Sequence, residues 1–431
     1  MKEDLLQYIW QFQYYNHSQL LGTNGERLLV LHPGQHNEHQ GPDFLEAKIK
    51  INETVWAGSV ELHIHSSDWN AHGHSSDANY QNVILHVVWT HDKEIWDGAG
   101  NAIPTLELQN RVSSVLLHRY RKLMERPVFI ACESAIHQLN ELVMVNWKER
   151  MVASRLAQRT QRIFGILEEM KYHWEETFWR LLAANFGLKV NGVFFEKIAE
   201  SIPVSLLAKH KHNLLQLEAL LLGQAGLLNA DFEDKYPAML ANEYRFLKTK
   251  YKLIPPAGSL YFLRMRPANF PTVRLAQLAV LVHQSEHLFS KLRETEDVAV
   301  VKKWLSVTAN DYWHYHYMPG EESLFKVKTL GKQMVENILI NTVVPAIYAY
   351  GAYNQDEAAK EKAVRWLNEL PAEKNSITSG FVHLKMENKS AFDSQAFIQL
   401  KNEYCDNHRC LQCAIGNVLL KKDLGVYQDC H

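Results

Sequence analysis

The chain of 431 residues lacks a long hydrophobic run. Its longest apolar stretches, Ala219–Leu222 and Ile338–Ile347, are short or interrupted by polar residues, whereas a helix needs about 20 apolar residues to cross a bilayer. The N-terminus has acidic residues at its start and Gln and Asn soon after, which is unlike a signal peptide. We therefore expect a protein that is neither inserted in a membrane nor exported.

Cysteine is scarce, and neither positive nor negative charge predominates. Only 5 cysteines are present, which is too few for the disulfide framework of a secreted chain of this size, so we expect a reducing, cytoplasmic location. The formal net charge of -2 gives no overall basic field, and any contact with nucleic acid therefore needs a local patch. With 46% hydrophobic and 22% charged residues, the composition is that of a chain folded throughout.

The hydrophobic pattern predicts an α+β protein with three parts. Residues 1–110 begin with an aromatic-rich helix over 3–20 and continue with period-two strands, which predicts a small mixed or antiparallel sheet. Residues 111–374 have helical periodicity, with a Pro/Gly-rich boundary near 250–270 and a helix that starts near Pro271. Residues 375–431 form a tail with a cysteine knuckle.

Histidines gather in the strand-rich part. Nine of the 22 histidines lie between His32 and His91. In the strand VELHIH, alternate residues share a face, so Glu61, His63 and His65 project together, away from the apolar positions between them. Asp43 opens the preceding strand and reaches the same end of a hairpin whose turn is Asn52-Glu53.

The register of this hairpin decides whether the carboxylates meet. A strict two-residue turn pairs Asp43 with Leu62, on the wrong face, whereas one extra residue in a bulge at Gly58 pairs it with His63. With that bulge, Asp43 and Glu61 are predicted to hold Mg²⁺ or Mn²⁺ and to orient water for phosphodiester attack, with a histidine close by.

This order of elements resembles the core of the PD-(D/E)XK nucleases. Pro42-Asp43 matches the PD, and Glu61-Leu62-His63 takes the place of E-x-K. The resemblance implies a restriction-endonuclease-like core, a metal held by Asp43 and Glu61, and DNA or RNA as substrate. The motif lysine is absent, so His63 or His65 would have to position water or stabilise charge in its place.

Most of the chain is also similar to a bacterial family of unknown function. The segments that carry the similarity are WQFQYYN, HPGQHNEHQGPDFLEAKI, WAGSVELHIHSSDWNAHGH, NVILHVVW and RMRPANFPTVRLAQLA. The similarity implies a common architecture and brings no activity with it.

Two other interpretations of the N-terminal cluster stay open. The PD dipeptide and the E-x-H pattern are each common, so both can belong to an ordinary half-exposed strand. Alternatively, a small histidine-rich fold, similar to the cupins, binds a transition metal through His63, His65 and either His72 or His74, because imidazole suits such ions better than Mg²⁺.

A cysteine knuckle near the C-terminus predicts structural zinc. Cys405, Cys410 and Cys413 include the C-x2-C half of a zinc site, and Cys430, His431 or His408 is available as the fourth ligand. Packing of reduced cysteines at a helix start is the plain alternative. A less favoured variant adds Cys132 and forms an iron–sulfur cluster, as in some PD-(D/E)XK enzymes.

Basic residues suggest where nucleic acid could bind. Arg264, Arg266 and Arg274 surround the PANFP turn and are candidates to contact phosphates, although solvated faces and packing on aromatic rings explain such residues more often. The leading hypothesis is a metal-dependent nuclease, or a degenerate one that binds nucleic acid. The alternative is a non-catalytic scaffold or nucleic-acid-binding protein with structural zinc.

Overall fold

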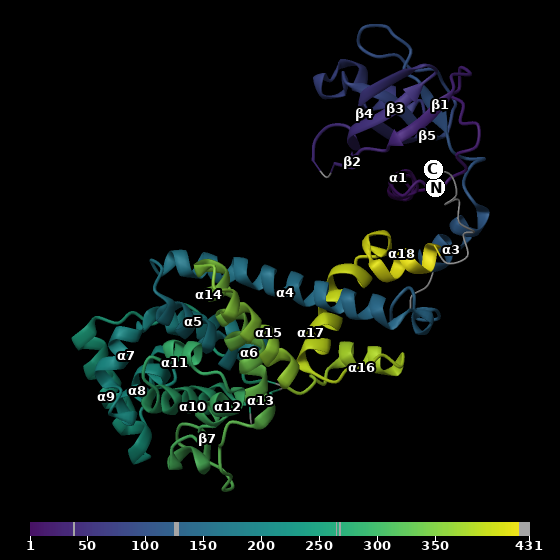
Figure 1. Ribbon diagram of the computed structural model, residues 1–431. Coiled ribbons are helices and arrows are strands. Elements are labelled where there is room, and N and C mark those ends of the chain that lie inside the picture. The colour runs from purple at the N-terminus through teal and green to yellow at the C-terminus, as the bar shows by residue number, and fades with distance from the viewer. Residues whose placement is uncertain (38, 125–128, 264, 267–268, 422–431) are drawn as a thin grey trace. The chain divides into compact units, whose positions relative to one another are not determined.

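The structure, a computed structural model, describes residues 1–37, 39–124, 129–263, 265–266 and 269–421 (Figure 1). The chain divides into two compact units: unit 1 comprises Met1–Trp147 and Lys401–His431, and unit 2 comprises Lys148–Leu400. Unit 1 contains a mixed sheet and unit 2 is largely helical, so the α+β class is confirmed.

Unit 1 is built on a sheet that has six strands among the described residues, in the order β1-β3-β4-β5-β6 with β2 paired to β3. Pairs β1/β3 and β3/β4 are antiparallel, whereas β4/β5 and β5/β6 are parallel. This single mixed sheet is not the double sheet of a cupin. The strands are β1 (Leu28–His32), β2 (Gln35–His36), β3 (Phe44–Ile51), β4 (Thr54–His65), β5 (Val83–Thr90) and β6 (Thr105–Glu107).

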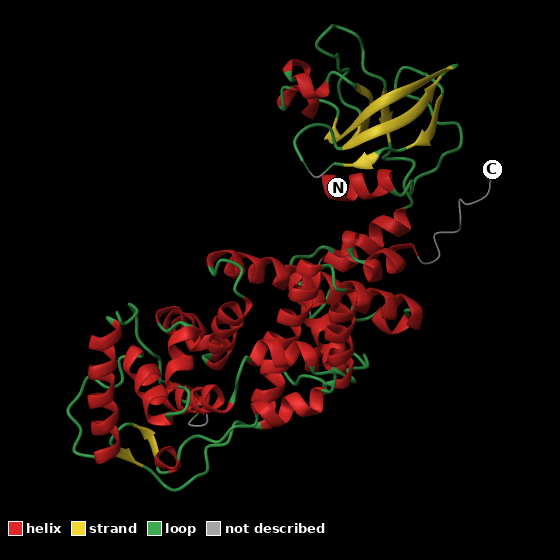
Figure 2. Cartoon of the chain, turned by 60° about the vertical axis from the view of Figure 1, so that its left-hand side comes forward, coloured by secondary structure: helices red, strands yellow, loops and turns green. Residues whose placement is uncertain are grey.

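Unit 1 also contains helices, which Figure 2 colours red together with those of unit 2. They are α1 (Glu3–Gln11), α2 (Asp68–Ala71), η1 (His74–Ser76), η2 (Ala78–Tyr80), α3 (Ser114–Met124), η3 (Ile136–Gln138), η7 (Leu400–Cys405), η8 (Cys410–Gln412) and α18 (Ala414–Lys421), together with the start of α4 (Glu141–Glu169). Helix α1 ends earlier than expected because Gln13 adopts a φ of 54°, a left-handed conformation outside helical geometry.

The two faces of β4 have different neighbours. Val60 and Leu62 are fully buried in a core that also contains Leu6 and Ile9 of α1. The alternate residues Glu61 and His63 therefore project from the opposite face. That face has its own small apolar cluster of Trp69, Ile95 and Ile103.

The β3/β4 hairpin has a bulge, but on the other strand from the expected one. Phe44 pairs with Val60 and Ala47 with Gly58, so Leu45 and Glu46 together face one residue of β4. Glu46 adopts a φ of 59° there. The expectation of a bulge at Gly58 is therefore wrong, and the register places Asp43 opposite Glu61 instead of His63.

Gly58 serves a different purpose. A Cβ at this position would lie 2.6 Å from the carbonyl oxygen of Asn82 and would collide with Ile84. Next to it, the parallel β4/β5 ladder shifts register between Ser59 and Val60. Glycine is thus required because the beginning of β5 approaches β4 closely.

The end of the chain belongs to unit 1, which the expected boundaries at 110 and 374 did not anticipate. Leu420 of α18 is fully buried in the core that contains α1, and Leu411 packs against it. The hydroxyl of Tyr8 donates a hydrogen bond of 2.7 Å to Asn417. Apolar contacts distant in sequence therefore outweigh the change of composition near residue 375.

Unit 2 is helical apart from one short strand pair, β7 (His316–Met318) with β8 (Glu321–Glu322). Its helices are the rest of α4, α5 (Trp174–Phe186), α6 (Leu188–Ser201), α7 (Val204–His210), α8 (Leu214–Gln224), α9 (Lys235–Tyr251), α10 (Pro271–Gln284), α11 (Leu288–Glu294), α12 (Val298–Leu305), η5 (Asp311–His314), α13 (Lys332–Ile338), η6 (Leu339–Val343), α14 (Val344–Asn354), α15 (Glu357–Glu369), α16 (Ser376–His383) and α17 (Ala391–Gln399). The expected helix start at Pro271 is confirmed. None of the described helices is long and apolar enough to cross a membrane.

Helix α8 lies in the interior of unit 2 and carries a buried acid. All its residues from Leu217 to Gln224 are buried, including Glu218. Tyr236 and Trp313 donate hydrogen bonds of 2.7 and 3.3 Å to one oxygen of Glu218. Burial outweighs these bonds and raises the pKa of Glu218 to about 7, so the neutral acid is favoured in the folded chain.

This pKa predicts how the stability of the protein depends on pH. In the unfolded chain Glu218 ionises near its ordinary pKa of 4.5, whereas in the folded chain it keeps its proton until about pH 7. The stability contributed by the proton is therefore lost as pH rises from about 4.5 to 7, by about 3 kcal/mol. Glu218→Gln should remove this loss. In chemical denaturation, the unfolding free energy of the variant minus that of wild type should therefore be larger at pH 8 than at pH 5.

The matched control is Glu233→Gln, at an exposed position. It should change the unfolding free energy equally at both pH values. A Glu218→Gln variant whose stability relative to wild type is the same at pH 5 and pH 8 would show that Glu218 is ionised in the folded chain.

Candidate metal centre

Asp43 and Glu61 interlock at the end of the β3/β4 hairpin. The backbone N–H of Asp43 donates a 3.0 Å hydrogen bond to Oε2 of Glu61, and the backbone N–H of Leu62 donates one of 3.0 Å to Oδ2 of Asp43. Gln7 of α1 donates a 2.8 Å bond to the other oxygen of Asp43. Both carboxylate oxygens of Asp43 thus accept hydrogen bonds, whereas Oε1 of Glu61 takes no part in these bonds.

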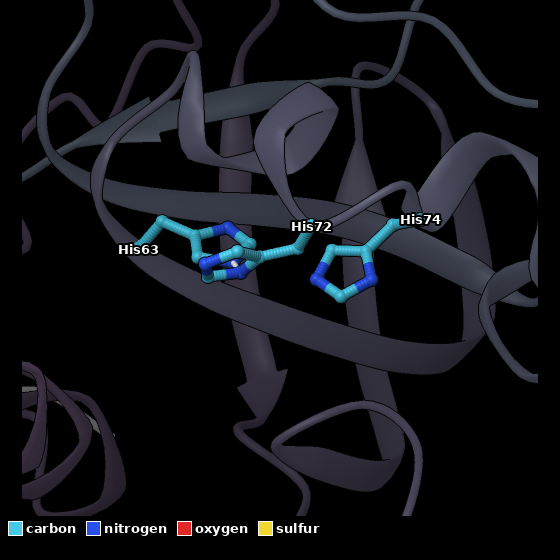
Figure 3. Close-up of side chains that lie close together, drawn as sticks. All are labelled: His63, His72 and His74. Carbon is cyan, nitrogen blue, oxygen red and sulfur yellow. Dashed lines mark hydrogen bonds between the residues drawn. The ribbon is translucent and has the colours of Figure 1, made fainter.

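That second oxygen of Glu61 faces a group of histidines. Oε1 lies 3.6 Å from Nε2 of His63 and 3.4 Å from Nε2 of His74. Nε2 of His63 is in turn 3.0 Å from Nδ1 of His72. One nitrogen each of His63, His72 and His74 lies within 4.8 Å of the other two, and Figure 3 shows the three rings gathered together.

The local sequence brings these rings together from two elements. His63 projects from β4, whereas His72 and His74 follow α2 on either side of Gly73. Gly73 adopts a φ of 73°, which glycine reaches without strain, so the chain can turn sharply between the two histidines. The ring of His74 stacks on Tyr80 with centroids 3.8 Å apart, which restricts its orientation.

Behind His63 lies a fully buried histidine, His86 of β5. Its Nε2 is 2.8 Å from Nδ1 of His63. When Nδ1 of His63 donates this hydrogen bond, its Nε2 keeps a lone pair directed at the histidine group. This tautomer of His63 can bind a metal through Nε2, with His86 as a contact outside the ligand group.

Burial makes His63 and His74 harder to protonate and makes the two acids harder to ionise. Burial lowers the pKa of His63 to about 3, and His74 and His72 lower it further; burial also lowers the pKa of His74. Burial raises the pKa of Glu61, and the negative charge of Asp43 raises it further. Burial also raises the pKa of Asp43. A bound cation would compensate the charge of this carboxyl pair, and neutral imidazoles can supply its nitrogen ligands.

Part of this geometry fits a small tetrahedral ion. With metal–nitrogen bonds of about 2.0 Å, a tetrahedral site has edges of about 3.3 Å. Three of the six edges that four ligands would form are close to this value, at 3.0, 3.4 and 3.6 Å. Glu61 lies outside the group of atoms that are all within 4.8 Å of one another, so it and His72 would have to move closer together to bind one ion. Nε2 of His74 is moreover buried without a hydrogen-bond partner. Three imidazoles and one carboxylate form a donor set typical of Zn²⁺, Mn²⁺ or Fe²⁺.

The predicted site residues are only partly brought together. Asp43, Glu61 and His63 converge as expected, although the two oxygens of Asp43 already accept hydrogen bonds. His65 shares their face but is exposed at the strand end and is not part of the histidine group. His72 and His74, named as alternatives for one ligand position, both belong to it.

His86 and Gln7 are functional candidates that the sequence analysis missed. A signal for His86 was present, because a histidine within the apolar strand VILHVVW needs a polar partner in the interior. Gln7 gave no such signal, since its role depends on how α1 packs against the hairpin.

The cysteines also differ from the expectation. Cys132, Cys405, Cys410 and Cys413 line one small cavity of unit 1, and all four are free thiols. Among the described residues, one group of three ligand residues has all its ligand atoms within 4.8 Å of one another, and this group consists of histidines. No three of the four sulfurs are therefore this close together. Cys430, the preferred fourth ligand, lies outside the described residues.

The expected nucleic-acid contacts of the PANFP turn are not all available. Arg274 is buried in α10, where it donates hydrogen bonds to Gln277 and Asn269, so this prediction is wrong for Arg274. Apolar packing of α10 on both sides explains its burial. Arg266 is exposed, and Arg264 lies outside the described residues.

Comparison with known proteins gives one match. Residues 3–376 match the family described as protein of unknown function DUF2851, a stretch that includes the histidine group and Cys132 but ends before Cys405. No curated protein and no solved structure matches the chain. The expected similarity to a family of unknown function is thus confirmed, and the nuclease resemblance stays a prediction. Because the match covers most of its length, the chain belongs to the DUF2851 family.

Proposed function

We propose that unit 1 binds one divalent transition-metal ion through His63, His72 and His74 with Glu61, and that it hydrolyses phosphodiester bonds at this ion. The observation that carries the proposal is the group of three imidazole nitrogens of His63, His72 and His74, two of which, those of His63 and His74, also lie near the oxygen of Glu61 that Asp43 leaves unoccupied. The donor set favours Zn²⁺, Mn²⁺ or Fe²⁺ over Mg²⁺, which prefers oxygen ligands.

The residues divide into ligands and positioning groups. Glu61 and the three histidines would hold the ion, whereas Asp43 holds Glu61 through its backbone N–H and His86 orients His63. A bound ion of this class makes water more acidic and polarises a phosphoryl oxygen. Because these four ligands fill a tetrahedron, water would have to enter as a fifth ligand, and the exposed side at His72 would give it access to the ion.

The choice of substrate rests on the order of motifs. The nuclease resemblance is a prediction from Pro42-Asp43 and Glu61; in support of it, Asp43 directly precedes β3 and its backbone N–H bonds to Glu61 of β4. A phosphodiester is therefore the substrate class to test first. The alternative, a protein that binds nucleic acid without cleaving it, predicts metal binding with no turnover.

Metal binding tests the first part of the proposal. Isothermal titration of the chelator-treated full chain with Mn²⁺ should show one site per chain, and thiolates should compete little for this ion because they prefer softer metals. His63→Gln and His74→Gln should each weaken binding by more than about 100-fold, since even indirect contacts contribute 10–100-fold.

His65→Gln is the matched control, because His65 lies on the same strand and face but outside the group. It should bind Mn²⁺ like wild type. Equal loss of affinity in His65→Gln and His74→Gln, with circular dichroism unchanged, would refute the assignment of the ligands.

Cleavage assays test the second part. The Mn²⁺-loaded protein should cut single- or double-stranded DNA or RNA, and Glu61→Gln should lower the rate by about 100-fold or more, as expected for a group that acts at the reacting centre. Asp43→Asn should have a smaller effect, about 10-fold. The side-chain oxygen of Asn can still accept the hydrogen bond from the backbone N–H of Leu62. The amide of Gln7 can turn so that its oxygen accepts a hydrogen bond from the side-chain NH₂ of Asn.

The two variants separate the roles of the acids. Equal and complete loss in both would mean that Asp43 is also a ligand. Mn²⁺ binding at the histidines without cleavage of any of these nucleic acids would leave the metal site standing and refute the hydrolase.

A further inference from the structure

Four of the 5 cysteines of the chain meet in unit 1, although Cys132 is far in sequence from the other three, which lie between 405 and 413. Cys132 follows α3, Cys405 ends η7, Cys410 begins η8 and Cys413 precedes α18. Together with Leu123, Ala131, Tyr404 and Gly416 they line one small cavity. Cysteine packs readily as a small apolar group, but packing alone does not require that two distant stretches of the chain bring four thiols to the same cavity.

The thiols interact with one another. Burial raises the pKa of Cys405, and the proximity of Cys132, Cys413 and Cys410 raises it further. Burial likewise raises the pKa of Cys132 to about 12, with further contributions from Cys413 and Cys410. The four sulfurs therefore surround a common space, although none is joined to another by a disulfide.

Hydrogen-bond donors are directed at one of these sulfurs. Burial raises the pKa of Cys413 to about 11, while hydrogen bonds from the backbone N–H groups of Gly416 and Ile415 and from the side chain of Trp147 oppose this rise. Such N–H groups at a helix start stabilise a thiolate, the form in which cysteine binds metals.

The backbone around the cavity is also closely fitted. A Cβ at Gly416 would overlap the carbonyl oxygen of Cys410, so glycine is needed for the loop of Cys410 to lie against the first turn of α18. The backbone of Cys410 is thus held against the helix that follows Cys413.

We propose that Cys132, Cys405, Cys410 and Cys413 bind one metal centre through four thiolates. Binding replaces the four thiol protons, which pass to solvent, with the positive charge of the centre. Cys132 takes the position that the sequence analysis gave to Cys430. This proposal is independent of the histidine group and of any hydrolytic activity.

The spacing of the sulfurs favours an iron–sulfur cluster over a single zinc ion. Zn–S bonds of about 2.3 Å give a tetrahedron with edges of about 4 Å, and the sulfurs are not gathered within 4.8 Å as the histidine nitrogens are. A cluster with several iron atoms holds its four cysteine ligands further apart. Both occupants share the four-thiolate chemistry and differ in iron, sulfide and zinc content.

The test measures iron, acid-labile sulfide and zinc in the full chain, purified without oxygen. The His63→Gln/His74→Gln background removes the contribution of the histidine group. Iron with sulfide is expected, and Cys132→Ser and Cys410→Ser should each lower the bound metal at least tenfold, whereas Cys430→Ser should keep it. One zinc per chain that is lost in Cys132→Ser would support the four-thiolate centre with zinc as its occupant.

Three results would overturn the proposal: no bound metal in the parent protein, metal retained in Cys132→Ser, or metal lost in Cys430→Ser. If Cys132→Ser does not fold, X-ray absorption of the parent protein decides at the edge of the metal found. Four sulfur neighbours at about 2.3 Å support the centre, and a shell that contains nitrogen or oxygen contradicts it.

Discussion

The hydrogen bond from the backbone N–H of Asp43 to Glu61 is the constraint on which the candidate metal centre depends. It occupies one oxygen of Glu61 and leaves the other toward His63 and His74. The bond exists because the bulge in β3 shifts the register so that Asp43 lies opposite Glu61. A regular ladder would turn Asp43 toward the apolar core, and the buried carboxyl of Glu61 would lose a donor that stabilises it.

The histidines add an energetic reason for a cation at this place. The imidazoles of His63 and His74 and a carboxyl pair are costly to bury when their polar atoms lack partners, as Nε2 of His74 does. A metal ion would satisfy these atoms together, and the apolar cluster around Trp69 would limit the approach of water from that side. The same reasoning applies to the cysteines, where a metal centre would compensate buried thiolates. Unit 1 would then hold two chemically different sites, one of nitrogen and oxygen ligands and one of sulfur.

Much of this arrangement could be predicted from the sequence, and its limits have physical causes. Alternation along VELHIH placed Glu61 and His63 on one face, because side-chain direction in a strand depends only on position. The bulge was predicted on the wrong strand, since Gly58 offered a conformational signal whereas Glu46 adopts its left-handed φ without one. The contributions of Gln7 and His86 depend on contacts between segments distant in the chain, which local patterns do not encode, whereas Cys132 was named only in the less favoured iron–sulfur variant. The return of α18 to unit 1 was missed for the same reason.

Anomalous diffraction from a crystal of the full chain soaked in Mn²⁺ tests the central claim most directly. The account predicts a manganese peak among the ligand nitrogens of His63, His72 and His74, with Oε1 of Glu61 in its coordination shell and Asp43 still bonded to Glu61. A site with no peak, in which Nε2 of His63 keeps its 3.0 Å contact with Nδ1 of His72, would contradict it.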